Sequence, residues 1–189
     1  MLPPKGATTV VCAAGPVRLS ASEEGGVELG YDADALDVLL RVREAIELRD
    51  GDLVCAGRQW LSFELGRDGR LPRLHLLDPM GEIHMTLSVR GGSLTLGREA
   101  GDVVLPWDDQ LGELHLQVLV RGDTVFVQNL VEHAGTWVLV RPGEVVPSGS
   151  TLAVGDRVME VGALDRWVPR DAAVTVPDPD GQTRIFAAA

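Results

Sequence analysis

Apolar and polar residues alternate along Ile83-His84-Met85-Thr86-Leu87-Ser88-Val89, where every odd-numbered position is apolar. Successive side chains of a β-strand point to opposite faces, so this pattern predicts a strand with one buried side and one solvent-facing side. An amphipathic helix would repeat its apolar residues every three or four positions instead. Gly91-Gly92 follows after Arg90 and is typical of a hairpin turn.

Short runs of the same kind continue toward the C-terminus, separated by Gly, Pro and Asp. They lie at 93–96, 102–105, 114–120, 124–130, 136–140 and 152–161. Short strands with turn residues between them are typical of a β-sandwich or barrel. The predicted fold class is all-β, a β-sandwich of antiparallel strands.

An internal repeat relates two parts of the chain. Residues 37–43 align with residues 135–141 at a shift of 98 positions (135 − 37), and the same shift places Gly51 on Gly149. It also places Gly57 on Gly155. Self-similarity at a fixed spacing is the signature of duplicated structural units, so we predict two related modules, one of them partial.

The segment 33–46 fits two structures. Leu36, Leu39 and Leu40 would lie near one face of an acid-capped helix, whereas the repeat aligns residues 38–43 with a run of strand character. Periodicity alone does not separate the two interpretations. We give precedence to the repeat and predict a strand at 38–43.

Composition indicates a folded, acidic protein. Of its 189 residues, 45% are hydrophobic and 24% are charged, which is close to the average for globular proteins and argues against wholesale disorder. Seventeen Lys and Arg against 28 Asp and Glu give a formal charge of -11, which repels nucleic-acid phosphates and anionic membranes. No apolar run approaches the roughly 20 residues of a membrane span. We expect neither a nucleic-acid partner nor membrane insertion.

Cysteine usage favours a reducing compartment. Cys12 and Cys55 are far apart and form no spacing suited to zinc, so we expect free thiols, a cytoplasmic location, and no metal or other cofactor. The sequence also lacks a Ser/His/Asp order, a phosphate-cradling glycine loop and an HExxH pattern. We therefore do not expect an enzyme.

Five landmarks between residues 73 and 164 follow one another in an order known from a protein family. A strand ending in Gly97-Arg98 precedes a strand at 102–105, a loop at 111–115, a strand with the turn 134–138, and a Leu-x-x-Gly-Asp stretch at 152–156. In this order they resemble the forkhead-associated (FHA) family, a β-sandwich of the SMAD/FHA type whose end loops bind phosphothreonine peptides. The resemblance covers about half of the chain.

The resemblance implies which loop residues would form the site. Arg98 matches the motif arginine, which in the family supports the binding loops and can reach phosphate. His115, Gly135 and Thr136 match residues that shape these loops. On its own, Arg98 also fits an exposed turn residue paired with a neighbouring carboxylate, Glu99 or Asp102.

Three positions depart from the family pattern. Gly112 stands where the family has a phosphate-contacting Ser, Glu113 where it commonly has a basic residue, and Ala134 where it has an Asn that holds the peptide backbone. A phosphothreonine pocket needs arginine and hydroxyl or amide donors, and a carboxylate beside the phosphate repels it. We therefore expect binding that is independent of phosphorylation. Trp107, which follows Pro106 in a loop, is the preferred surface candidate for contact with a partner.

The resemblance also predicts a domain organisation. Residues 48–64 resemble the final hairpin of a second FHA-like module whose front half is missing. The predicted parts are an incomplete half module at 1–66, a linker at 67–72, a β-sandwich at 73–165 and a tail at 166–189. Two apolar runs of the tail, 172–176 and 183–186, supply the missing strands of the N-terminal half, pair with a partner, or fray.

The predicted function is that of a non-catalytic, bacterial-type protein–protein interaction module in signalling. Its expected partner is a protein linked to a Ser/Thr kinase or to a multi-subunit assembly. Two rivals stay open. One is a phosphothreonine reader that still uses Arg98, and the other is a structural subunit that forms a homo-oligomer through its sheet edges.

Overall fold

The computed structural model describes residues 7–12, 15–22, 26–34, 37–132, 134–155, 157–161 and 182–185. Regular secondary structure in these ranges consists of β-strands, which pair mainly in the antiparallel sense. The all-β prediction is confirmed. The chain divides into two compact units, Met1–Leu40 with Val140–Ala189 and Arg41–Leu139. We call them the terminal unit and the inserted unit and describe each by itself.

The terminal unit contains strands of two sheets. One has the order β1 (Ala7–Cys12), β2 (Gly15–Ser22), β3 (Gly26–Gly30), β15 (Val145–Val146), and the other β18 (Gln182–Ile185), β17 (Arg157–Val161), β16 (Thr151–Val154), β4 (Val38–Arg41). Val17 from the first sheet and Leu152 from the second belong to one buried cluster. Tyr31 connects the two chain segments of this unit, Met1–Leu40 and Val140–Ala189, because its hydroxyl donates a hydrogen bond to the Val140 carbonyl.

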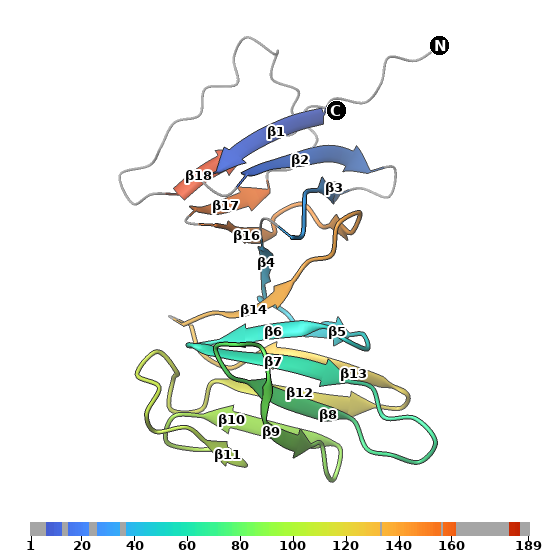
Figure 1. Cartoon of the computed structure of the whole chain (residues 1–189), viewed down its shortest axis with the longest axis vertical. Coiled ribbons are helices and arrows are strands. Elements are labelled where there is room, and N and C mark those ends of the chain that lie inside the picture. Colours follow the sequence, from blue (N-terminus) through green and yellow to red (C-terminus); the bar gives the residue numbers. More distant parts are fainter. Residues whose placement is uncertain are drawn as a thin grey trace. The chain divides into compact units, whose positions relative to one another are not determined.

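The inserted unit is a β-sandwich (Figure 1). One sheet has the order β11 (Val103–Val104), β10 (Ser93–Gly97), β12 (Leu116–Arg121), β13 (Thr124–Asn129), β5 (Ile46–Leu48). The other sheet contains, in order, β14 (Thr136–Leu139), β6 (Leu53–Ala56), β7 (Gln59–Glu64), β8 (Arg73–Leu77), β9 (Ile83–Ser88). Leu96 and Leu116 from the first sheet pack in one cluster with Phe63 and Leu74 from the second.

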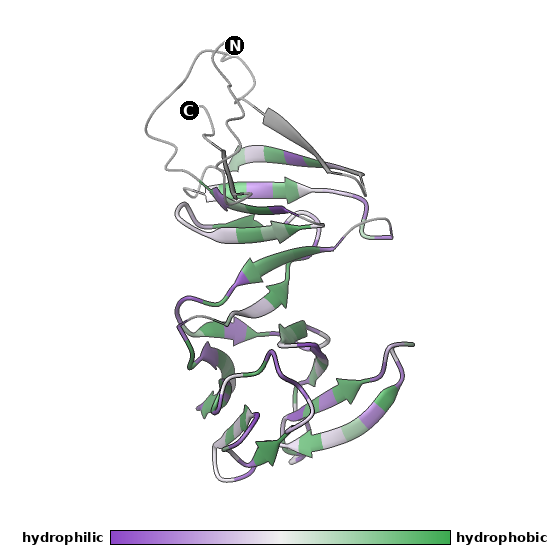
Figure 2. Ribbon diagram, turned by 90° about the vertical axis from the view of Figure 1, so that its left-hand side faces the viewer, coloured by the Kyte–Doolittle hydropathy of each residue, from purple (hydrophilic) through white to green (hydrophobic). Residues whose placement is uncertain are grey.

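Burial alternates along the central strands as the sequence predicts, and Figure 2 shows hydrophobic and hydrophilic residues alternating along the ribbons. In β13, Val125 and Val127 are buried while Phe126 between them is only half-buried. Full burial of a Val or Leu side chain contributes roughly 1.5–3 kcal/mol relative to exposure. The shared core of the two sheets is therefore the main source of their stability.

Several strand predictions are now settled. β4 occupies Val38–Arg41, which confirms a strand rather than a helix there. The run 152–161 is not one strand but two, β16 and β17, with Gly155 in the turn at a φ of 58° that favours glycine. β9 is a strand, yet only its end at Leu87 packs against the core, and Ile83 and Met85 are 59% and 37% exposed.

The compact units do not follow the predicted domain boundaries. The expected linker at 67–72 is the loop between β7 and β8, which pair along their whole length from Trp60 with Leu77 to Glu64 with Arg73. Because this hairpin joins the two sides of the expected linker, residues 41–66 lie in the inserted unit. Of the tail, β18 pairs in parallel with β17 in the terminal unit, and 172–176 lies outside the described residues.

The 98-residue shift of the sequence repeat recurs in the strands. β14 begins 98 residues after β4 (136 − 38), and β16 begins 98 residues after β6 (151 − 53). The registers correspond as well, since Leu40 pairs with Leu152 in the terminal unit and Val138 pairs with Val54 in the inserted unit. In each unit, therefore, strands from one repeat pair with strands from the other.

Candidate functional site

The loops singled out by the sequence meet at one end of the inserted unit. The backbone amides of Arg98 and Glu99 donate to the carbonyls of Gly112 (2.8 Å) and Glu113 (3.0 Å). Gly97 makes this approach possible, since a Cβ at that position would overlap the Glu113 carbonyl. The glycine of the Gly-Arg landmark is thus required by the close packing of two backbones.

His115 connects the same loops from inside the unit. Its side chain is fully buried, and its Nδ1 accepts a hydrogen bond from the Gly112 amide at 2.9 Å. The His115 carbonyl accepts from the Leu130 amide at 2.8 Å, and its amide donates to the Leu96 carbonyl at 2.9 Å. Through these hydrogen bonds His115 connects Leu96, Gly112 and Leu130.

The protonation state of His115 follows from its contacts. Because Nδ1 acts as an acceptor, the neutral ring carries its proton on Nε2. This nitrogen is buried and has no hydrogen-bond partner of good geometry among the described residues. Burial lowers the pKa of His115, although the Gly135 backbone and the Asp108 carboxylate act in the opposite direction. The ring is therefore a neutral structural group at physiological pH.

Asn129 orders the loop between β13 and β14, which we call the third loop. Its Oδ1 accepts from both the amide (3.2 Å) and the hydroxyl (2.9 Å) of the fully buried Thr136, and its Nδ2 donates to the Val131 carbonyl. Sequence reasoning assigned a loop-shaping role to Gly135 and Thr136 but missed Asn129. An Asn at a strand end before a Gly-Thr turn was the available signal. Ala134, in the same loop, is half-buried.

Arg98 is a surface residue paired with its neighbour. Its Nε and Nη2 lie 3.0 and 2.5 Å from Oε1 of Glu99. Asp102, the other partner considered, instead accepts from the Thr95 hydroxyl at 2.8 Å, and this hydrogen bond lowers the pKa of Asp102. An exposed ion pair contributes at most about 1 kcal/mol, so the pairing with Glu99 alone would not keep Arg98 from binding an anion.

The backbone of Gly112 is enclosed on two sides. Its amide is occupied by His115, and a Cβ on Gly112 would overlap Cγ1 of Val131. A serine in this backbone would need Val131 to move. Glu113 next to it is exposed and brings a further carboxylate to the rim. At this end of the unit the Gly112 amide is thus already hydrogen-bonded, and Glu113 adds an exposed carboxylate.

Trp107 is 63% exposed on a loop that is anchored by the neighbouring Asp108. The buried Asp108 carboxylate accepts hydrogen bonds from the Arg58 amide (2.8 Å), Gln59 Nε2 (2.7 Å) and the Gln110 amide (3.0 Å). Burial by itself raises the pKa of Asp108, but these hydrogen bonds outweigh it and hold the pKa below its usual value. Sequence reasoning found Trp107 and missed Asp108, because its partners Arg58 and Gln59 lie far away in the chain.

A cavity of about 430 Å³ adjoins the third loop. It is lined by Arg41, Val42, Arg43, Asn129, Leu130, Val131 and Glu132. The guanidinium of Arg41 lies 5.9 Å from the ring centroid of Trp137 and donates to the Glu132 carbonyl at 3.3 Å. Two arginines and one glutamate give this cavity a mixed wall with an excess of positive charge.

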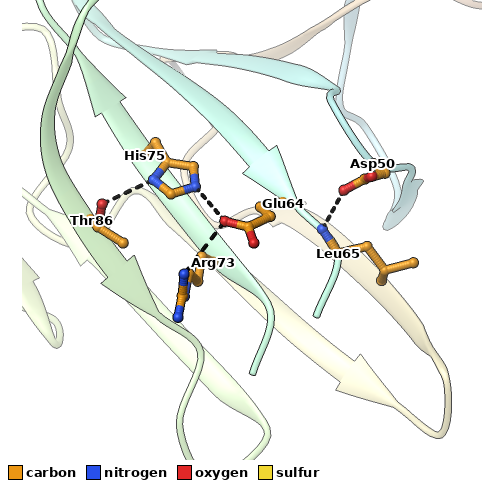
Figure 3. Close-up of polar contacts among 6 residues, drawn as sticks. All are labelled: Asp50, Glu64, Leu65, Arg73, His75 and Thr86. Carbon is orange, nitrogen blue, oxygen red and sulfur yellow. Dashed lines mark hydrogen bonds and ion pairs between the residues drawn. The ribbon is translucent and has the colours of Figure 1, made fainter. Parts of the chain in front are cut away.

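A separate polar cluster connects β7, β8 and β9 (Figure 3). His75 Nε2 lies 2.9 Å from Glu64 Oε2, His75 Nδ1 lies 3.0 Å from Thr86 Oγ1, and Arg73 Nη1 lies 3.7 Å from Glu64 Oε2. A carboxylate, an imidazole and a hydroxyl in series also occur in nucleophilic triads. Here the nearby amides belong to sheet ladders and lie in the plane of the sheet, where they cannot stabilise an oxyanion above it. We interpret the cluster as a cross-strand connection.

Comparison of the chain with models of protein families, with curated proteins and with solved structures found no match. Within the described ranges, no three His, Cys, Asp or Glu side chains are grouped so that they would hold a metal ion. The same ranges contain no helix of the length and apolarity needed to cross a membrane. What the geometry defines is an all-β protein whose inserted unit has three loops hydrogen-bonded around a buried histidine.

Proposed function

We propose that this protein is a non-catalytic, FHA-like interaction module whose loop end binds a partner protein without reading phosphate. The observation that carries the proposal is the environment of Gly112. Its amide is bound to His115, Val131 fills the space of a side chain, and the exposed Glu113 follows. Hydrogen bonds to a charged group contribute roughly 1.5–3 kcal/mol each, so losing such donors and adding a carboxylate removes most of the affinity for phosphate.

Trp107 is the anchor that we assign to the partner contact. Its ring is largely exposed, while the carboxylate of the next residue, Asp108, is buried and holds the loop backbone through three hydrogen bonds. A large aromatic side chain on an ordered loop loses little conformational entropy on binding. Exposed tryptophans that become buried at interfaces commonly contribute about 2 kcal/mol or more.

The proposal is tested by capturing partners from an extract of the native cell on the immobilised full chain, with and without phosphatase treatment. We expect capture that phosphatase does not change. For the captured protein, identified by mass spectrometry and purified, Trp107→Ala should weaken binding about 30-fold. Met80→Ala is the matched control, because Met80 is 86% exposed in the turn between β8 and β9. Equal losses for both variants would contradict the assignment of the surface.

A phosphothreonine reader is the second candidate, and the cavity beside the third loop favours it. Arg41 and Arg43 line this cavity and supply donors that the Gly112 position lacks. Micromolar binding of a phosphothreonine peptide library, lost in Arg41→Ala or in Arg98→Ala, would establish the reader. Together with partner capture that phosphatase abolishes, this result would overturn the phosphate-independent proposal.

A further inference from the structure

Two arginines of the inserted unit lie over aromatic rings, and one of these two also lines the cavity beside the third loop. The guanidinium of Arg121 lies 5.6 Å from the ring centroid of Phe126, and that of Arg41 lies 5.9 Å from the ring centroid of Trp137. Arg41 belongs to the wall of the cavity of about 430 Å³, whereas Arg121 does not. An aromatic ring attracts a guanidinium and favours stacked orientations of its plane. Arg41 is therefore an arginine held in place beside a space of ligand size.

Most hydrogen-bond donors of Arg41 are not used within the described residues. A guanidinium has five N–H groups. In Arg41, Nη2 donates to the Glu132 carbonyl at 3.3 Å, and Arg41 forms no ion pair with another residue that the structure describes. The chain has 28 acidic and 17 basic residues, yet this arginine is bound to a backbone carbonyl and to a ring rather than to a carboxylate. Its remaining donors are thus available to an external anion.

The rest of the cavity wall suits a singly charged side chain. Arg43 adds a second guanidinium and Glu132 a carboxylate, so the wall has an excess of one positive charge. A carboxylate balances this excess, whereas a phosphothreonine carries about −1.5 to −2 charges at pH 7 and would be balanced only in part. Leu130, which is 36% exposed, and the half-buried Val131 supply apolar surface for the methylene groups of an acidic side chain.

We propose that this cavity binds the side-chain carboxylate of a glutamate or aspartate in an unphosphorylated segment of the partner protein. The carboxylate accepts hydrogen bonds from the remaining N–H groups of Arg41, whose planar fork of donors matches two carboxylate oxygens. Trp137 and the Glu132 carbonyl hold the guanidinium before the ligand arrives, which lowers the entropic cost of binding. The inference rests on the proposed function, since it names the chemistry of a partner that binds without phosphate.

The test measures binding of the full chain to three fluorescent peptide libraries that are random except for one central residue. That residue is glutamate, its neutral isostere glutamine, or phosphothreonine. We expect the apparent Kd of the glutamate library to be about tenfold lower than that of the glutamine library, because hydrogen bonds to a charged group are stronger than those to a neutral group. The phosphothreonine library should bind no more tightly than the glutamate library.

Substitutions of Arg41 assign the preference for glutamate to this cavity. Arg41→Gln should make the glutamate and glutamine libraries bind equally. Arg41→Lys keeps the charge without the planar fork and should keep only part of the preference. Arg121→Gln is the matched control, because Arg121 also lies over an aromatic ring but does not line the cavity. This control variant should retain the tenfold difference between the two libraries.

Several outcomes would overturn the inference. These are equal binding of the glutamate and glutamine libraries by the wild type, no binding of either up to about 1 mM, and an equal effect of Arg41→Gln and Arg121→Gln. Tighter binding of the phosphothreonine library would also overturn it and would support the phosphothreonine reader. If Arg41→Gln impairs folding, Arg41→Lys decides in its place.

Failure of this inference is distinguishable from failure of the proposed function. Partner capture that phosphatase leaves unchanged and that Trp107→Ala weakens would support the proposed function even if Arg41→Gln had no effect on either library. Conversely, loss of partner capture after phosphatase treatment would contradict the proposed function. The libraries would then still show whether the cavity prefers a carboxylate, because that comparison uses peptides of defined chemistry and no captured partner.

Discussion

Replacing His115 with alanine tests the centre of the loop network. The substitution removes a fully buried ring and the Nδ1 that accepts from the Gly112 amide at 2.9 Å. An unsatisfied buried amide costs about 1–3 kcal/mol, and truncation of a buried side chain of this size costs about 2 kcal/mol or more. In the wild type, Nε2 of this ring has no good hydrogen-bond partner, which reduces the net contribution of His115 to the free energy of unfolding. We expect the free energy of unfolding to fall by about 3 kcal/mol.

The effect of His115→Ala should depend on pH. Burial lowers the pKa of His115 in the folded protein, whereas the unfolded chain binds a proton near the usual value of about 6.5. Between these two pKa values the unfolded state holds more protons, so wild-type stability falls as the pH drops below about 6.5. Protonation would also turn an N–H of the ring toward the Gly112 amide. The alanine variant lacks this group, so its stability deficit should shrink toward about pH 5.

Urea unfolding of the full chain at about pH 7.5 and about pH 5.5 measures both effects. His84→Ala is the control, because His84 is exposed on β9 and its loss should change stability by less than about 0.5 kcal/mol. A deficit for His115→Ala below about 1 kcal/mol at the higher pH would refute the role of the histidine in joining the loops. A deficit that does not shrink at the lower pH would refute the neutral, buried state.

Three further outcomes are expected. The segment 41–139 should fold alone, whereas deleting residues 1–66 removes β5, β6 and β7 and should leave a chain without native circular dichroism. In urea titrations, Gly112→Ser should lower the free energy of unfolding by about 1–3 kcal/mol, and adding Val131→Ala should recover part of that loss. Gly57→Ala should cost about 1 kcal/mol or more, because its φ is 58° and a Cβ would contact a buried carboxylate. No loss in either glycine variant would contradict the corresponding close contact.

Local periodicity was sufficient to predict most strands of the inserted unit. β10, β12 and β13 lie within the predicted runs or overlap them closely, because alternation is a property of consecutive residues. The same signal did not show whether the apolar face of a strand is covered. Ile83 and Met85 alternate in the sequence as regularly as Leu87, but a register shift between β8 and β9 separates Ile83 from Met85, and both side chains are exposed. Coverage depends on which strand comes next, and that information is not local.

In the candidate site, too, some residues were predictable from local sequence and others depend on the fold. Gly97 and His115 were recognised from the order of landmarks, and the backbone approach of their loops gives each a physical role. Asn129 and Asp108 were missed, since their functions depend on hydrogen-bond partners that only the fold brings near. Arg98 was found together with its neighbour Glu99, because this contact is between adjacent residues.

The sequence patterns do not specify where the compact units begin and end, for a more specific reason. β4 and β14 have the same length, as do β6 and β16, each pair is 98 residues apart, and Gly57 and Gly155 have the same φ of 58°. Leu40 and Val138, 98 positions apart, therefore find equivalent partners, Leu152 and Val54, in the opposite repeat. Hydrophobic pattern and turn chemistry are satisfied equally by pairing within a repeat and between repeats, so they do not specify either one.

The pairing of strands between the two repeats determines where the chain can be cut into parts that fold. A cut between the repeats separates β4 from β16 and β14 from β6, so it removes paired strands from both units. A cut at the ends of 41–139 preserves β5 to β14 with their shared core, although this segment contains the end of one repeat and the beginning of the next. The compact units follow hydrogen-bonded pairing rather than the sequence repeat, so truncation at the repeat boundary should fail where truncation at the unit boundary succeeds.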